Sequence, residues 1–201
     1  MKRTVFLAVL AAPIAGCSSG PGWKRQTFAF SAPAAQPVIA TETNMVALRR
    51  VSISPLFQNR AFTYRTGENT YEQDPYASFL VAPDRALKEP LRASLAAFGR
   101  VLEPGSSLPA TLDAEVTIAE LYADFRDPAR PAGRLAAHVV VYRPGAEGPT
   151  AVVFDKLCSA QSAMSAKTPA GLMAAWDSCL REINQQIRSE YAKASAADGG
   201  R

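Results

Sequence analysis

The chain has 201 residues, of which 48% are hydrophobic, 20% charged and 8% aromatic, and its formal net charge is +4. That length suffices for one domain with a sizeable apolar core. No run of lysines and arginines with interleaved aromatic residues is present, which argues against nucleic-acid binding. After the N-terminal segment, no hydrophobic stretch approaches the roughly 20 residues that a membrane-spanning helix needs.

The first residues have the pattern of a lipoprotein signal peptide. A Lys-Arg pair at residues 2–3 precedes an apolar run, residues 5–12, which is too short to span a bilayer. Ile14-Ala15-Gly16 then leads directly to Cys17, the arrangement of a bacterial lipobox, in which the cysteine thiol is acylated before cleavage. The sequence therefore predicts a signal peptide over residues 1–16 and a lipidated Cys17 as the first residue of the mature chain. The alternative is an ordinary signal peptide followed by a chance cysteine.

Acylation at Cys17 would anchor the protein at a membrane. Each buried methylene contributes about 0.8 kcal/mol, so two or three acyl chains hold a protein there almost permanently. Ser18 and Ser19 follow the cysteine. The absence of an Asp there resembles the enterobacterial pattern for release to the outer membrane, and we expect a location on its periplasmic face. Residues 17–44 are rich in Ser, Gly, Pro, Ala and Thr, which predicts a tether containing one short strand at residues 27–30.

The first half of the domain predicts strands followed by a helix. Partial alternation predicts a strand over residues 46–53, and residues 61–65 and 70–73 form a hairpin around Gly67. Pro83 is suited to the first turn of a helix. The apolar side of that helix consists of Leu87, Leu91, Leu95 and Phe98. Pro90 either kinks this helix or delays its regular part until Glu89, and Gly99 ends it.

The second half predicts a three-stranded meander and a final helix. Residues 111–118 alternate strictly, as expected for a strand with one buried and one solvated face. Residues 135–142 and 151–159 predict the next two strands. Thr168 caps a helix with Pro169 at its first position. The apolar stripe of that helix consists of Leu172, Trp176, Cys179, Leu180, Ile183 and Ile187.

This order of elements predicts an α+β fold. We expect a mostly antiparallel sheet with two main helices packed on one face. The expected periplasmic domain spans residues 45–192, and residues 193–201 are expected to form a flexible C-terminal tail.

The remaining two cysteines, Cys158 and Cys179, would lie in an oxidising compartment where disulfides persist. Cys158 shares its side of the predicted strand with Phe154, and Cys179 lies in the apolar stripe of the final helix. We therefore expect the two thiols to meet in a disulfide between strand and helix. The alternative is two buried cysteines that act as small hydrophobic residues.

Motifs for catalysis are missing from the sequence. There is no Gly-rich phosphate loop, and Gly105-Ser106-Ser107 lacks the strand–turn–helix context of a nucleophile elbow. The only histidine, His138, lies in mid-strand and is expected to pack or to lie on the sheet surface. Asp124, Arg126 and Asp127 have the composition of a solvated turn. We expect no catalytic residue, no metal and no cofactor.

An ordered set of segments behind the lipobox resembles the ABC-type transport auxiliary lipoprotein family, which includes the paraquat-inducible-operon lipoprotein. The matching segments are Cys17-Ser18-Ser19-Gly20, Phe28-Ala29-Phe30, Val51-Ser52-Ile53-Ser54-Pro55, Phe62-Thr63-Tyr64-Arg65, Tyr76-Ala77-Ser78-Phe79, Leu87-Lys88-Glu89-Pro90-Leu91, Leu112-Asp113-Ala114-Glu115-Val116 and Ala175-Trp176 with Ile183 and Ile187. Together they cover nearly the whole mature chain. The chain departs from the family pattern between residues 74 and 86: Phe79 or Tyr76 stands where a Trp is common, and the segment from Phe79 to Ala86 is longer than usual.

The resemblance implies an outer-membrane-anchored partner of an inner-membrane transport complex. Such a complex contains an ABC ATPase, a permease and an MCE-type (mammalian cell entry) protein that forms a conduit for lipid. The lipoprotein would be its auxiliary docking component, with no catalysis of its own, and some relatives form homo-oligomers. Two alternatives stay open: a lipoprotein chaperone or plug of an outer-membrane assembly machine, and a periplasmic enzyme with an unrecognised site.

Overall fold

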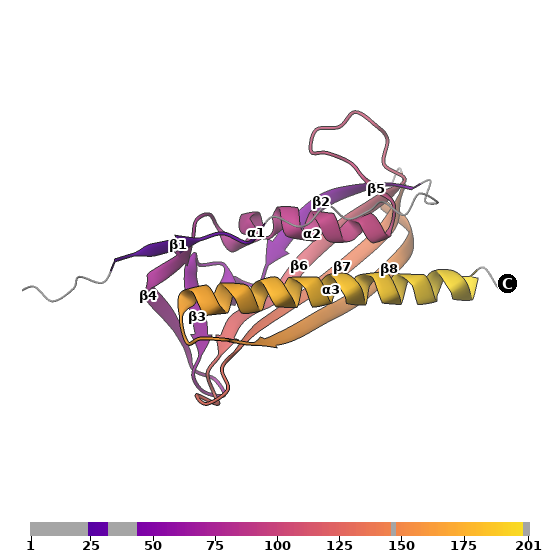
Figure 1. Cartoon of the computed structure of the whole chain (residues 1–201). Helices are drawn as coiled ribbons and strands as arrows, with labels where there is room; N and C mark the ends of the chain where they lie inside the picture. Colours follow the sequence, from indigo (N-terminus) through magenta and orange to yellow (C-terminus); the bar gives the residue numbers. More distant parts are fainter. Residues whose placement is uncertain (1–23, 32–43, 146–147, 199–201) are drawn as a thin grey trace, which may run out of the picture.

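The computed structural model describes residues 24–31, 44–145 and 148–198 (Figure 1). Cys17 lies outside these residues. In the described part of the chain the fold is α+β, as expected, with one eight-stranded sheet and three α-helices. The strands are β1 (Gln26–Phe28), β2 (Met45–Ile53), β3 (Ala61–Arg65), β4 (Tyr71–Phe79), β5 (Arg100–Val101), β6 (Leu112–Asp124), β7 (Ala132–Gly145) and β8 (Gly148–Ala163), and the helices are α1 (Pro83–Ala86), α2 (Lys88–Ser94) and α3 (Pro169–Asp198).

The sheet is organised around β6. On one side β6 pairs antiparallel with β7, which in turn pairs with β8, and this is the expected meander. On the other side it pairs in parallel with β2 over residues 112–118 and with β3 at residues 123–124. The two ends of β6 therefore join different parts of the first half of the chain.

The expectation of a mostly antiparallel sheet is wrong. Among the described residues, four of the seven strand pairings are parallel, namely β1–β4, β2–β5, β2–β6 and β3–β6. The alternation in residues 111–118 was consistent with a strand that has one buried face. A parallel strand in a sheet covered by helices on a single face shows the same alternation, so the pattern does not reveal strand direction.

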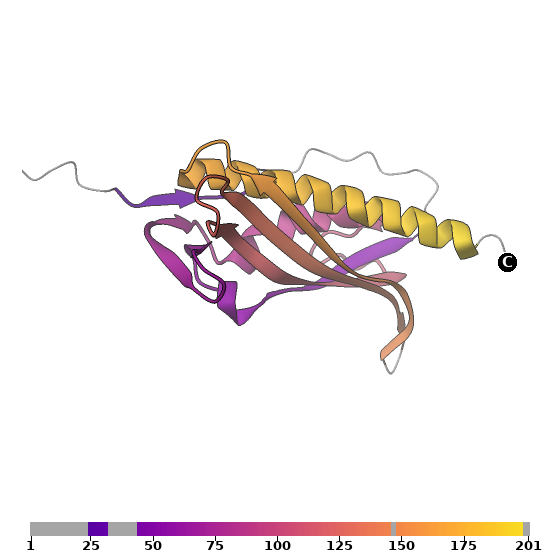
Figure 2. The same cartoon turned by 90° about the horizontal axis from the view of Figure 1, so that it is seen from below.

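The helices lie on one face of this sheet (Figures 1 and 2). The first predicted helix is divided into α1 and α2 at Leu87, and Pro90 stands in the first turn of α2, where its missing N–H costs no hydrogen bond. The side chains expected on its apolar side are all buried: Leu87, Leu91, Leu95 and Phe98. The last helix, α3, is longer than expected. It continues through residues 193–198, where the sequence had suggested a flexible tail.

α3 is fixed to the sheet at Trp176, whose side chain is fully buried. Its indole N–H donates to the backbone carbonyls of Tyr122 (3.3 Å) and Arg134 (3.2 Å), which belong to β6 and β7. Gly133 allows this close approach, because a Cβ at that position would lie 3.0 Å from the Cβ of Ala175. Around the indole, ring centroids lie 5.1 Å away for Phe62 and 5.4 Å away for Phe79.

The N-terminal segment also joins this aromatic cluster. β1 adds a parallel edge strand to β4, with Gln26 opposite Ala77. Phe28 packs against Phe62, with ring centroids 5.3 Å apart, while the hydroxyl of Ser31 donates to Asp177 on α3 at 2.5 Å. Residues 24–31 are thus part of the folded domain and not only a tether.

Replacing Trp176 tests this core. Trp176→Ala should lower the free energy of unfolding by about 3–5 kcal/mol, because it removes the largest buried side chain and leaves a cavity. Trp176→Phe keeps most of the ring packing but leaves two carbonyls without the indole donor, so a loss of about 1–2 kcal/mol is expected. Urea unfolding followed by circular dichroism measures both. Equal stability of Trp176→Ala and the wild type would contradict the role of Trp176 as the residue that fixes α3 to the sheet.

Candidate functional site

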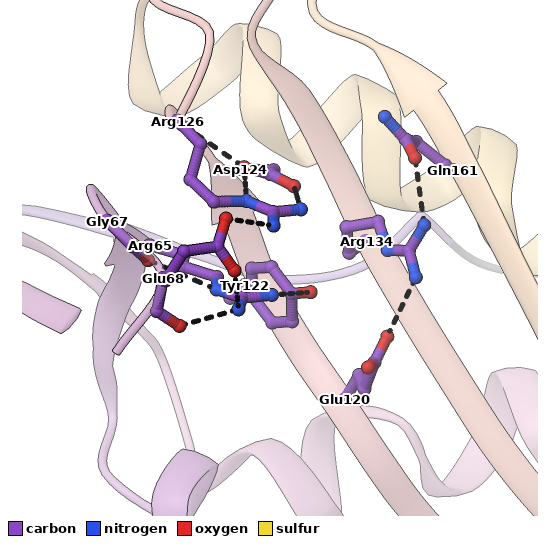
Figure 3. Close-up of polar contacts among 9 residues, drawn as sticks. All are labelled: Arg65, Gly67, Glu68, Glu120, Tyr122, Asp124, Arg126, Arg134 and Gln161. Carbon is purple, nitrogen blue, oxygen red and sulfur yellow. Dashed lines mark hydrogen bonds and ion pairs between the residues drawn. The ribbon is translucent and has the colours of Figure 1, made fainter. Parts of the chain in front are cut away.

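Two hairpin turns meet at one end of the sheet and bring together a cluster of charged and aromatic side chains (Figure 3). One turn joins β3 to β4 and the other joins β6 to β7. We call this cluster the hairpin network; its members are Arg65, Glu68, Tyr122, Asp124 and Arg126. The parallel pairing of β3 with β6, which places Arg65 opposite Asp124, positions the two turns side by side.

Arg126 links the two turns. Its guanidinium contacts both oxygens of Asp124, at 3.0 and 2.7 Å, and a third nitrogen–oxygen distance of 3.0 Å joins it to Glu68 in the other hairpin. Asp124 is buried and also accepts the backbone N–H of Arg126. The hydrogen bonds from the Arg126 side chain are the main reason that the pKa of Asp124 lies below its ordinary value.

The guanidinium group of Arg65 forms hydrogen bonds with the backbone of the β3–β4 turn. It donates to the backbone carbonyls of Glu68 (2.6 Å) and Gly67 (3.3 Å). Its guanidinium carbon lies 5.7 Å from the ring centroid of Tyr71 and 6.0 Å from that of Tyr122. Both distances fit cation–π contacts, so the arginine is fixed by its turn and by two aromatic rings.

Polar side chains also form pairs on the outer face of β6, β7 and β8, which is the face opposite the helices. Arg134 reaches Gln161 on β8 (2.8 Å) and Glu120 on β6 (3.4 Å). Further along, His138 contacts Asp155 at 2.6 Å, so it lies on the sheet surface, one of the two positions expected from the sequence. Next to the hairpin network the surface contains a hollow with a volume of about 770 Å³. The hollow is lined by Asp124, Arg126, Asp127, Arg130, Ala132, Gln161 and Ala163.

This arrangement suits binding through hydrogen bonds. The guanidinium groups of Arg65, Arg126 and Arg134 are matched by carboxylates of Glu68, Asp124 and Glu120. Because the charges are paired, the surface presents oriented donors and acceptors with little net charge, which favours a polar partner surface over a free anion. In the part of the chain that the structure describes, no group of three His, Cys, Asp or Glu side chains is placed to hold a metal ion. None of the helices among these residues combines the length and the hydropathy needed to cross a membrane.

The structure does not bring Cys158 and Cys179 together. Both thiols are free and buried. Cys158 pairs with Ala137, whereas the thiol of Cys179 donates to the carbonyl of Gly133 at 3.4 Å. These two positions on β7 are four residues apart, which corresponds to about 13 Å along a strand. A disulfide requires Cα atoms within about 7 Å. The two residues share one helix–sheet interface, but they occupy different positions along it.

Sequence reasoning missed the hairpin network. Asp124 and Arg126 have the composition of any solvated turn, and Arg65 lies far away in the sequence. The alternation of β6 does place Tyr122 and Asp124 on one side of the strand. No local signal, however, shows that β3 pairs with the end of β6.

The fold of the chain resembles the crystal structure of protein XCC0632 from Xanthomonas campestris, labelled DUF330, with a TM-score of 0.60, 11% identity and coverage of 90% of this chain and 94% of that chain. A second solved structure, of an uncharacterized protein, has a TM-score of 0.59 at 9% identity and covers 87% of this chain and 98% of that chain. A hypothetical protein, CT253 from Chlamydia trachomatis, has a TM-score of 0.46 at 15% identity, with coverage of 74% and 97%.

At these identities the likeness to the first two structures shows a shared fold, and the third is too distant to add to it. No family model matches the chain, and no curated protein matches its sequence.

The hairpin network predicts a pH-dependent stability difference. Asp124→Asn should lower the free energy of unfolding by about 2 kcal/mol at pH 7, since the buried carboxylate loses its charge-assisted hydrogen bonds to the partly exposed Arg126. Because the folded-state pKa of Asp124 is depressed, its contribution is complete above its unfolded pKa of about 3.9 and falls as the pH drops through the folded pKa. The difference between the wild type and the variant should therefore be constant above about pH 4 and should shrink as the pH falls from there toward the folded pKa of Asp124.

Asp127→Asn is the matched control. Asp127 pairs with Arg130 at 2.8 Å in the same turn, but both side chains are exposed, so its removal should have a smaller effect. Chemical denaturation from pH 3 to pH 7 would compare the three proteins. A loss for Asp127→Asn that equals the loss for Asp124→Asn would contradict the role assigned to the network.

The cysteine geometry gives another prediction. Alkylation of the native protein should leave Cys158 and Cys179 unmodified, because burial raises the pKa of both thiols, for Cys179 to about 11. After denaturation without a reducing agent, both should react. Mass spectrometry of the non-reduced digest measures this directly, and a peptide pair linked through the two cysteines would refute the separation seen in the structure.

Proposed function

We propose that this protein is an outer-membrane-anchored periplasmic lipoprotein, and that it acts as the auxiliary docking component of an ABC/MCE-type intermembrane lipid transport system. Cys17, preceded by Ile14-Ala15-Gly16, is the observation that carries the proposal, because it supplies the membrane anchor. Ser18 and Ser19 favour the outer membrane. The ordered resemblance to the transport auxiliary lipoproteins supplies the partner, an MCE-type protein.

The described domain supports a binding role. On its outer sheet face, hydrogen bonds hold polar side chains such as Arg134 and Gln161 in pairs. The hairpin network links the two hairpin turns at one end of the sheet (Figure 3). A surface held in one conformation loses little entropy on docking. The fold shared with a solved DUF330 protein over 90% of the chain is consistent with a domain of this kind. In this proposal the protein contributes no catalysis, metal or cofactor.

Two other functions remain to be distinguished by experiment. A chaperone or plug of an outer-membrane assembly machine would share the anchor and the α+β domain, but its partner would be an outer-membrane barrel. A periplasmic enzyme would need a nucleophile and a base in one place. The hairpin network instead pairs guanidinium groups with carboxylates.

The anchor is tested by metabolic labelling. Cells that produce the protein and take up an alkyne fatty acid should yield a labelled wild type and an unlabelled Cys17→Ala variant. Density separation of the membranes should place the labelled protein in the outer-membrane fraction. Equal labelling of both proteins would remove the anchor from the proposal, and labelled protein confined to the inner membrane would remove its assigned location.

The partner is tested by affinity purification of the tagged, lipidated protein from detergent extracts. Mass spectrometry should find the MCE-type protein encoded with the transport system, and the purified chain alone should not hydrolyse ATP or lose its fold in a chelator. Recovery of an outer-membrane barrel without any MCE-type protein would favour the assembly role.

A further inference from the structure

The edge of the sheet formed by β1 and β4 lies close in sequence to the proposed anchor. β1 begins at Gln26, which is fixed opposite Ala77 by strand pairing. Only eight residues separate Gln26 from Cys17. A fully extended chain spans at most about 3.3–3.6 Å per residue, so this edge lies within about 30 Å of an acylated Cys17.

Large apolar side chains are exposed along the same edge. Tyr76 is 43% exposed, Leu80 58% and Val81 43%. Tyr76 stands in an irregular part of β4, where the carboxylate of Asp74 accepts the backbone N–H groups of Tyr76 (2.7 Å) and Ala77 (2.9 Å). Phe79, between the exposed residues, points into the core. In both views β4 and the start of β1 lie at the same end of the molecule (Figures 1 and 2).

Positive charge accompanies these apolar residues. Lys24 and Arg25 are exposed where the chain enters β1, and Arg25 immediately precedes Gln26, whose strand partner Ala77 follows Tyr76. Of the nearby carboxylates, Asp74 already accepts three hydrogen bonds, one of them from the hydroxyl of Tyr64 at 2.5 Å. Asp84 is half-buried in the first turn of α1. Tyr76 lies beside the basic residues, while Leu80 and Val81 follow further along the same edge, where the Leu80 N–H donates to the carbonyl of Phe28. Basic and exposed apolar residues along one edge suit the interface of an anionic bilayer.

We propose that this surface, made of Lys24, Arg25, Tyr76, Leu80 and Val81, rests on the headgroup region of the leaflet that carries the acyl anchor. The proposal depends on the proposed acylation of Cys17. The tether then keeps the surface at high local concentration near the bilayer, so that weak apolar and electrostatic contacts are sufficient to orient the domain. The outer sheet face and the hairpin network are held in a defined direction relative to the membrane.

Lipid crosslinking tests the orientation. The full lipidated protein, with a photo-activatable diazirine residue at position 80, is reconstituted in vesicles of phosphatidylcholine and phosphatidylglycerol. The matched control carries the probe at position 157, since Leu157 is equally exposed (62%) but lies on β8. The yield of lipid adduct at position 80 should exceed that at position 157 by roughly tenfold, because only the surface facing the headgroups touches lipid.

Charge variants separate this surface from simple tethering. The double variant Lys24→Glu with Arg25→Glu should lower the adduct yield at position 80 by roughly tenfold in anionic vesicles. Lys156→Glu, an exposed change on β8, should leave the yield unchanged.

Vesicle flotation of the wild type and of Cys17→Ala measures the anchor independently. If flotation does not depend on Cys17, the anchor and the proposed function fail. If flotation depends on Cys17 but positions 80 and 157 give equal lipid adducts, or position 80 crosslinks to a second copy of the protein, the proposed orientation is overturned while the anchor stands.

Discussion

The close packing of α3 on the sheet at Gly133 is the constraint on which the rest of the fold depends. The indole of Trp176 donates to the carbonyls of Tyr122 and Arg134 in two neighbouring strands, so the helix is fixed in position as well as buried. This packing favours a residue without a Cβ in β7, because a methyl group at position 133 would lie only 3.0 Å from the Cβ of Ala175 and would push α3 outward. The aromatic cluster around the same indole then holds β1 and β4.

Because helices cover one face of the sheet, its opposite, outer face is left to carry polar side chains. With its apolar side chains directed at α2 and α3, the sheet presents alternate residues on its outer face, and these form cross-strand polar pairs such as Arg134 with Glu120. The exposed edge strand β8 is partly protected, because the Gln186 side chain of α3 donates to the carbonyl of Ser159 (2.8 Å) and accepts its N–H (3.2 Å). An amide that occupies the edge in this way discourages unspecific strand pairing.

The sequence predicted those features that depend on local pattern. The apolar spacing in α3, the Pro at its start and the meander of β6, β7 and β8 all follow from periodicity and turn chemistry, and the structure confirms them. Strand direction and long-range pairing were not predictable in this way. The parallel pairing of β3 with β6, on which the hairpin network depends, joins Arg65 and Asp124 across many intervening residues. Likewise, shared burial of Cys158 and Cys179 said nothing about their positions along the interface.

The central claim is that a membrane-tethered domain presents its outer sheet face to an MCE-type partner, and in-cell photocrosslinking tests it most directly. A photo-activatable residue replaces Gln161, which lies beside the hairpin network on that face. After illumination of cells that contain the native transport system, crosslinked products are isolated from separated membranes and identified by mass spectrometry. The account predicts a product that joins this protein to an MCE-type protein. A product formed only with an outer-membrane barrel would contradict it.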